Sequence, residues 1–131
     1  MPAKAAPTGV RMARAQDLIA TAYRRFIVEV PALDKLKLVI RLELRGRGDV
    51  QVFRVRTPGP QTTKGEPDDA RVSVSIARSH FNELATEGRL KDWREAYEHG
   101  HIKITGDRRV IRLVENVIDR HEQRARVKRR R

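Results

Sequence analysis

Apolar and polar residues alternate along the middle of the chain, and this pattern predicts paired β-strands. Between residues 35 and 45 every second residue is leucine or isoleucine, as expected for a strand with one buried face: Leu36, Leu38, Ile40, Leu42 and Leu44. Gly46 and Gly48 then form a turn into a second strand at residues 50–56, so that the two strands make an antiparallel hairpin. The apolar residues of the second strand fall on both of its faces, and we expect a bulge that turns them toward the same face.

Two further strands complete the predicted sheet. Residues 71–76 alternate valine or isoleucine with serine, which predicts a third strand. The intervening residues 57–69 contain three prolines and two glycines and are predicted to be a surface loop. Residues 101–105 alternate isoleucine with polar residues and are predicted to be a fourth strand.

Apolar residues at helical spacing predict four helices. The first spans residues 10–30 and ends there, because Pro31 cannot continue it. Two short helices follow the third strand and end at Gly88 and Gly100. A longer helix starts at Asp107, and its apolar residues form a stripe along one side: Val110, Leu113, Val114, Val117 and Ile118.

These elements predict an α+β fold, with a mixed, mainly antiparallel sheet of four to five strands layered with helices. Three strands are expected to be antiparallel, and a fourth returns to the sheet after a helical crossover. The chain has 131 residues, enough for one modest core. We expect a single domain at residues 10–120, a flexible lead at residues 1–9 and a basic tail at residues 121–131.

The block from Ala96 to Asp107 is the most distinctive part of the chain. Its pattern, Ala-x-x-x-Gly-x-Ile-x-Ile-x-Gly-Asp, ends one helix, forms one strand and opens the next helix. Gly100 is expected to adopt the left-handed conformation that ends a helix, and Asp107 is expected to cap the helix that follows. Together with the serine-containing strand and the two short helices before it, this block resembles the sterol carrier protein-2 family. The element order matches over residues 14–120, and the residue pattern matches over residues 72–118.

The resemblance implies a non-enzymatic domain that binds a lipid or another apolar molecule between the sheet and the helices. The lining of such a site would come from apolar residues of both layers: Leu38, Ile40, Leu42, Val74, Ile76, Phe81, Leu84, Trp93, Tyr97, Ile104, Leu113 and Val117. The alternative is that the same residues fill a closed core, because protein interiors are densely packed.

The charge of the chain adds a second prediction. A formal net charge of +12 favours anionic partners of any kind. The candidates for binding a polyanion lie at the C-terminus: Arg120, Arg124, Arg126, Lys128, Arg129, Arg130 and Arg131. These residues could bind an anionic membrane, bind nucleic-acid phosphates without reading sequence, or remain solvated. A basic module that binds nucleic acid or a protein partner, on the same fold with a filled core, is therefore the alternative function.

The sequence offers little for chemistry. The chain contains no cysteine, which excludes disulfides, thiolate metal sites and cysteine nucleophiles. His99 and His101 flank Gly100, but a third metal ligand would have to come from a distance, so exposed polar side chains are the favoured interpretation. We predict no catalytic residue, no metal and no cofactor. No apolar run approaches the roughly 20 residues that span a bilayer, and the lack of cysteine and of an apolar signal segment favours the cytoplasm.

Overall fold

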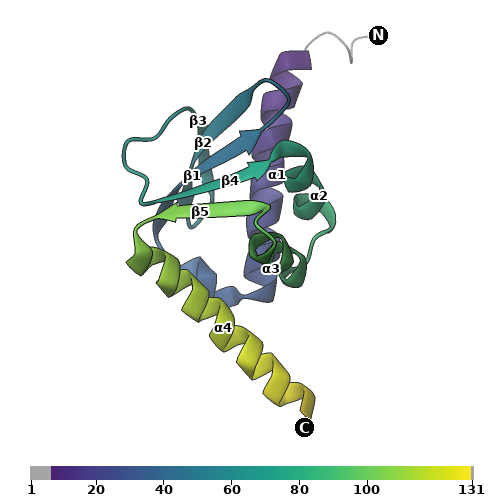
Figure 1. The fold of residues 1–131 in the computed structure, drawn as a ribbon, viewed down its shortest axis with the longest axis vertical. Helices are drawn as coiled ribbons and strands as arrows, with labels where there is room; N and C mark the ends of the chain where they lie inside the picture. The colour runs from purple at the N-terminus through teal and green to yellow at the C-terminus, as the bar shows by residue number, and fades with distance from the viewer. Residues whose placement is uncertain (1–6, 131) are drawn as a thin grey trace.

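The computed structural model describes the backbone of residues 7–130 and the side chains of residues 15–128. Most of the predicted N-terminal lead lies outside the described residues, and residues 7–9 form the start of the first helix. Figure 1 shows the elements in chain order: α1 (Pro7–Glu29), the 3₁₀-helix η2 (Pro31–Lys35), β1 (Leu38–Arg45), β2 (Val50–Thr57), β3 (Gln61–Lys64), β4 (Val72–Ala77), α2 (Arg78–Glu87), α3 (Leu90–Glu98), β5 (Ile102–Gly106) and α4 (Arg108–Arg130).

The five strands form one mixed sheet in the order β3-β2-β1-β4-β5, which confirms the predicted fold class. Neighbouring strands are antiparallel except for β1 and β4, which are parallel. The third predicted strand is β4, and the prediction that it is antiparallel to the strands of the hairpin was therefore wrong. Residues 65–71 return the chain to the end of the sheet at which β1 begins, so β4 enters in the same direction as β1.

Two local predictions need correction. The pairing of β1 with β2 runs without interruption from Leu38↔Thr57 to Arg45↔Val50, which leaves no residue for a bulge. The valines that conflicted with the apolar pattern, Val50 and Val52, lie on the outer face, where Val50 is 55% exposed and Val52 is half-buried. The predicted loop at residues 57–69 contains the short strand β3, whose polar sequence Gln-Thr-Thr-Lys gives no alternating apolar signal.

The first strand starts later than its leucine pattern predicts, because Pro31–Lys35 form a 3₁₀-helix. The buried hydroxyl of Thr57 marks the start of β1. It donates a hydrogen bond to the carbonyl of Leu36 at 3.0 Å and accepts one from the N–H of Leu38 at 3.2 Å.

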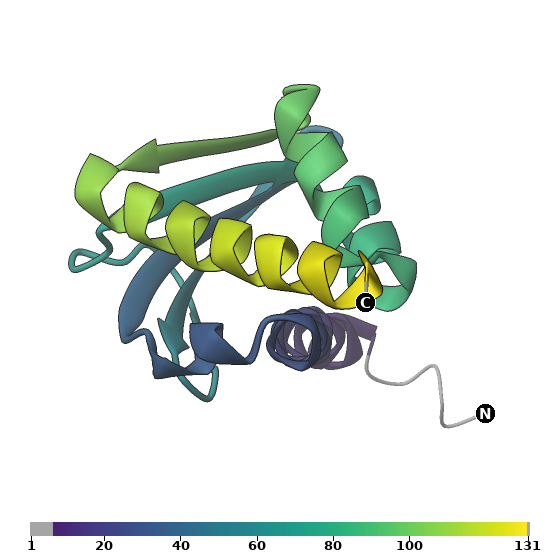
Figure 2. The ribbon, with the colours of Figure 1, turned by 90° about the horizontal axis from the view of Figure 1, so that it is seen from below.

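All four α-helices lie on one face of the sheet, as Figure 2 shows from below. The face toward the helices is apolar, and its centre packs on α1 and α2 in a closed core with Phe53, Leu44 and Ile76 at 0–1% exposure. Because side chains alternate along a strand, the residues between these core positions lie on the opposite, helix-free face. The sheet therefore separates an apolar core on one side from a polar, solvent-facing surface on the other.

Polar side chains on the outer face link β1 to β4 and to the segment that follows β3. Arg41 donates to Glu43 at 3.0 Å and to Ser73 at 3.1 Å, and it also pairs with Glu66. Ser75 donates a hydrogen bond to Glu43 at 2.9 Å. This bond, and a second one from Arg41, lower the pKa of Glu43.

Two glycines in the distinctive block have positive φ, but they have different surroundings. Gly100 has φ +81° and open space where a Cβ would lie, which confirms the predicted helix end. Gly106 has φ +124°, and a Cβ there would overlap the carbonyl oxygen of Arg71. That carbonyl accepts a hydrogen bond from the N–H of Asp107 at 2.9 Å, so β4 and the start of α4 meet at this point.

We expect Gly106→Ala to lower the free energy of unfolding by about 3 kcal/mol, because backbone strain and overlap with Arg71 act together. Gly100→Ala, the matched control, should cost about 1 kcal/mol, because only backbone strain acts there. Urea unfolding followed by circular dichroism measures both. Equal losses would show that the contact with Arg71 is not a constraint.

Candidate functional site

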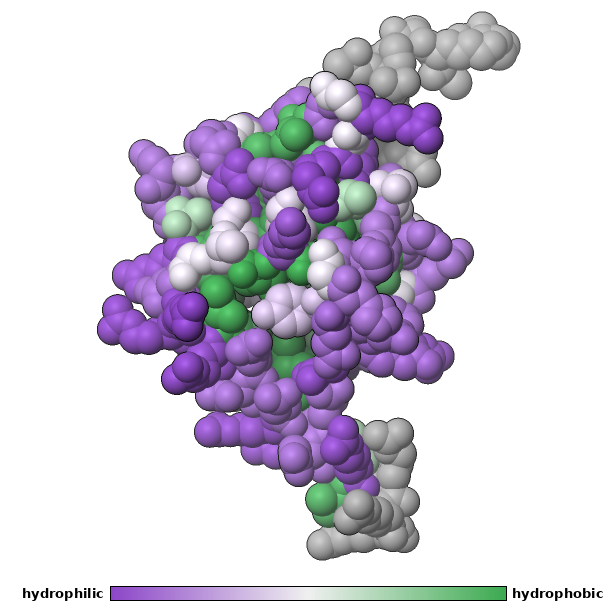
Figure 3. Space-filling model, viewed as in Figure 1, coloured by the Kyte–Doolittle hydropathy of each residue, from purple (hydrophilic) through white to green (hydrophobic). Residues whose placement is uncertain are grey.

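Half-buried apolar side chains lie where the sheet meets α3 and α4. Ile40 of β1, Val74 of β4 and Ile104 of β5 lie on the inner face of the sheet. All three pack against the closed core without being part of it. Figure 3 shows apolar side chains gathered below β5, toward α3 and α4. The inner face of the sheet is therefore well covered by α1 and α2 but incompletely covered beyond them.

Helices α3 and α4 contribute the facing side chains. Trp93 of α3 is half-buried, and its ring lies 5.0 Å from that of Phe26 and 6.0 Å from that of Phe81. On α4, Val114 and Ile118 are half-buried and lie four residues apart, on one face of the helix. We call the following set the apolar seam: Ile40, Val74, Trp93, Ile104, Val114 and Ile118.

The residues predicted to line a ligand site fall into three groups. Leu42, Ile76, Phe81 and Leu84 are 1–7% exposed and belong to the closed core. The half-buried group has six members: Leu38, Ile40, Val74, Trp93, Ile104 and Val117.

The third group is exposed. Tyr97 is 39% exposed and Leu113 is 46% exposed. The lining prediction also omitted Val114 and Ile118, although their spacing with Val110 was already visible in the sequence. The structure therefore brings part of the predicted lining together and leaves Tyr97 and Leu113 facing solvent.

Helix α4 is held at two separated points. At its start, the N–H of Asp107 donates a hydrogen bond to the carbonyl of Arg71 at 2.9 Å, which ties the helix to β4. Asp107 Oδ1 also accepts a hydrogen bond from the N–H of Arg109 at 2.9 Å, which confirms the predicted cap and lowers the pKa of Asp107. At the start of the predicted basic tail, Arg94 of α3 binds Asp119 at 2.9 Å and Glu122 at 2.7 Å. The bond to Asp119 is the main reason that the pKa of Arg94 is raised. Between these points, the backbone of α4 comes close to η2 and β5.

The predicted basic tail continues α4 without a break to residue 130. Its described basic side chains, Arg120, Arg124, Arg126 and Lys128, are all exposed. The side chains of Arg129 and Arg130, and the whole of Arg131, lie outside the described residues.

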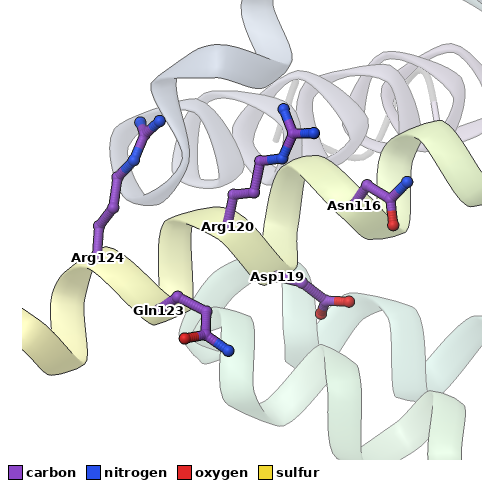
Figure 4. A pocket seen from close by; sticks show the side chains of 5 residues that line it. All are labelled: Asn116, Asp119, Arg120, Gln123 and Arg124. Carbon is purple, nitrogen blue, oxygen red and sulfur yellow. The ribbon is translucent and has the colours of Figure 1, made fainter.

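An open cavity of about 510 Å³ lies on the surface of α4, away from the apolar seam. Its lining is polar: Asn116, Asp119, Arg120, Gln123 and Arg124. Figure 4 shows Arg120 and Arg124 projecting to one side of the helix, toward η2 and α1, while Asp119 and Gln123 project to the other side. The side chains of α4 are thus sorted by type around its axis.

A second cavity, of about 440 Å³, lies over α2 and α3 and includes three histidines. The His80 and His101 rings are 5.4 Å apart, and the His99 and His101 rings are 6.2 Å apart. His99 and His101 are exposed, as predicted. Across the described part of the chain, no group of three or more His, Cys, Asp or Glu residues is arranged to hold a metal ion. Neither this cavity nor the one on α4 lies between the sheet and the helices.

Among the helices that the structure describes, none is both long enough and apolar enough to cross a membrane.

The fold and the sequence place the chain in a family. The model of the SCP-2 sterol transfer family matches residues 25–119, and the chain belongs to this family. Among curated proteins, none matches the chain.

Solved structures with the same fold are distant in sequence. Palmitated SCP2L2 from Aedes aegypti is 19% identical with a TM-score of 0.52, and the alignment covers 74% of this chain and 91% of that protein. Sterol carrier protein 2 from Yarrowia lipolytica, in its apo form, is 17% identical with a TM-score of 0.46. That alignment covers 54% of this chain and 63% of the yeast protein, so the chain spans less than two thirds of it.

The two ion pairs of Arg94 generate a prediction about α4. We expect Arg94→Gln to release the second half of this helix, with backbone amides around Asp119 exchanging hydrogen about fivefold faster, because exposed ion pairs contribute up to about 1 kcal/mol. Arg112→Gln is the matched control, since Arg112 forms no ion pair among the described residues. Hydrogen-exchange mass spectrometry measures both variants. Unchanged exchange in Arg94→Gln would show that packing alone holds α4.

Proposed function

We propose that this protein is a non-enzymatic carrier that binds a lipid or another apolar or amphipathic molecule at the apolar seam. The observation that carries the proposal is that Ile40, Val74 and Ile104, on the inner face of the sheet, pack against the closed core but stay only half-buried. Membership of the SCP-2 sterol transfer family and the fold shared with a palmitated relative support the same assignment.

The energetics favour an acyl or polycyclic ligand. Each methylene removed from water contributes about 0.8 kcal/mol, so roughly ten methylenes contribute about 8 kcal/mol before the cost of ordering the chain. The ligand would lie between the inner face of the sheet and α4, and it would cover side chains that are now half-exposed. Helix α4 would move aside to admit it, because its attachments are the bond between Asp107 and Arg71, the two Arg94 ion pairs and a limited contact with η2 and β5. Uptake and release would occur by partition, without a covalent step.

The basic side chains of α4 would serve the same carrier by bringing it to an anionic surface, where apolar cargo is stored and delivered. Arg120, Arg124, Arg126 and Lys128 are exposed and available for such a contact. Each basic residue close to an anionic leaflet contributes about 1 kcal/mol.

We expect native purification to yield an extractable apolar molecule detectable by mass spectrometry, and palmitate to raise the melting temperature of the delipidated protein. Val114→Asn should weaken palmitate binding about tenfold, because it places an amide in the seam. The matched control is Leu113→Asn, one residue away at an exposed position, which should leave palmitate affinity in solution unchanged. An empty protein that palmitate does not stabilise would contradict the proposal.

A basic module that binds nucleic acid or a protein partner is the second candidate, and the exposed arginines of α4 favour it. Phe53, the aromatic residue nearest the basic strand residues, is 0% exposed, so such a module would bind phosphates without stacking on bases. This function predicts that nucleic acid co-purifies at low salt and is lost when residues 124–131 are deleted. Clean protein at low salt, judged by its ultraviolet spectrum, would exclude it.

A further inference from the structure

Helix α4 carries a stripe of arginine and aliphatic residues on one flank. The members are spaced by three or four residues and so share one side of the helix: Arg109, Leu113, Val117, Arg120, Arg124 and Val127. We call this set the arginine–aliphatic stripe. It contains three arginines and no acidic residue.

The acidic residues of α4 lie on a different flank. Glu115, Asp119 and Glu122 again follow a spacing of three or four residues, and the last two bind Arg94 of α3. At 3.6 residues per turn, this acidic flank is roughly 150° around the axis from the stripe. Figure 4 shows the division directly, because Arg120 and Arg124 point away from Asp119. Arg109 pairs with the capping residue Asp107 at 3.7 Å, whereas Arg120 and Arg124 have no ion pair with an acid among the described residues of their own helix.

The stripe is open to solvent. The Arg109 side chain is 93% exposed, Leu113 is 46% exposed and Val127 is 50% exposed. Arg120 and Arg124 are also exposed, whereas Val117 is half-buried at the edge toward the body of the protein. The neighbouring element η2 adds one exposed acid, Asp34, which accepts a hydrogen bond from Tyr23 at 3.0 Å, and one exposed base, Lys35.

Exposed aliphatic residues set between arginines decide which anionic partner fits best. Nucleic-acid phosphates would use the arginines alone and would leave Leu113 and Val127 in water. A helix that lies in the plane of a membrane interface uses both kinds of residue, because its aliphatic side chains enter the acyl boundary while its arginines reach the headgroups.

We propose that the arginine–aliphatic stripe docks α4 in the plane of an anionic phospholipid membrane. The biological purpose of this contact rests on the proposed carrier function, but the contact itself can be measured without a cargo. In this orientation the acidic flank of α4 remains against α3, and the half-buried Val114 and Ile118, on a third side of the helix, stay outside the membrane contact.

The test uses the delipidated full chain and vesicles of phosphatidylcholine with or without phosphatidylglycerol. We expect co-sedimentation with the anionic vesicles only. Arg120→Gln combined with Arg124→Gln should weaken it about 30-fold, at about fivefold for each arginine. Arg112→Gln combined with Arg126→Gln removes the same charge outside the stripe and should cost less than about fivefold. Equal losses in the two double variants would overturn the proposal.

The aliphatic residues separate a membrane from nucleic acid. Leu113→Asn combined with Val127→Asn should weaken vesicle binding at least about tenfold and leave binding to duplex DNA unchanged. Because the chain has no cysteine, a fluorophore sensitive to polarity can be placed at Leu113→Cys or, as a control, at Glu115→Cys. A blue shift on vesicles at position 113 alone is the expected result. Unaltered vesicle binding by the aliphatic variant, or no shift at position 113, would assign the arginines to a general polyanion contact and overturn the proposal.

The outcomes also separate this proposal from the carrier function. Vesicle binding by a protein that never binds palmitate would support the docking stripe and contradict the carrier. Palmitate binding by a protein that does not bind anionic vesicles would contradict the stripe and support the carrier.

Discussion

The structure depends on the placement of β1 between two partners, β2 on one side and β4 on the other. A central strand with both edges paired cannot slip by one residue without moving Leu42 and Leu44 into water and Arg41 and Glu43 into the core. This constraint assigns each strand a dry face and a wet face. Once the dry face is set, α1 and α2 have a surface to cover, and the arginines of β1 and β2 are left on the open face, where Glu43, Glu66 and Asp69 bind them.

The same constraint leaves the sheet with more apolar surface than its helices cover well. The inner-face side chains near β1 and β2 are covered by α1 and α2, as the 0% exposure of Phe53 shows. Toward β5, coverage passes to α3 and α4, and Val74 and Ile104 remain half-buried. A helix that is held by the bond between Asp107 and Arg71 at one end and by Arg94 further along can leave this part of the sheet at a smaller cost than a helix packed along its whole length.

Sequence reasoning succeeded where a local rule acts alone. The alternation of β1, the positive φ of Gly100 and the cap at Asp107 each follow from one stretch of chain, and the structure has all three. It failed where a contact with a distant part of the chain decides the structure. Strand β3 exists because β2 offers an unpaired edge, and nothing in Gln61–Lys64 shows this in the sequence. Exposed Val50 suggested a bulge because the sequence does not reveal which valines of the strand are buried in the core. The predicted lining was divided for a similar reason, since Phe81 and Leu113 are both apolar but one lies under α1 and the other faces water.

The two proposed tasks of α4, as a wall for cargo and as a contact for a membrane, would use different sides of the helix. Val114 and Ile118 are half-buried, Asp119 and Glu122 bind α3, and Arg120 and Arg124 project toward η2 and α1, at intervals of very roughly a third of a turn. A membrane that binds the arginine–aliphatic stripe would not compete with cargo for the apolar seam, but it would hold the helix from the side opposite Arg94. Under the two proposals, the ion pairs of Arg94 would link docking to opening, since α4 would leave the sheet only when Asp119 and Glu122 release that guanidinium.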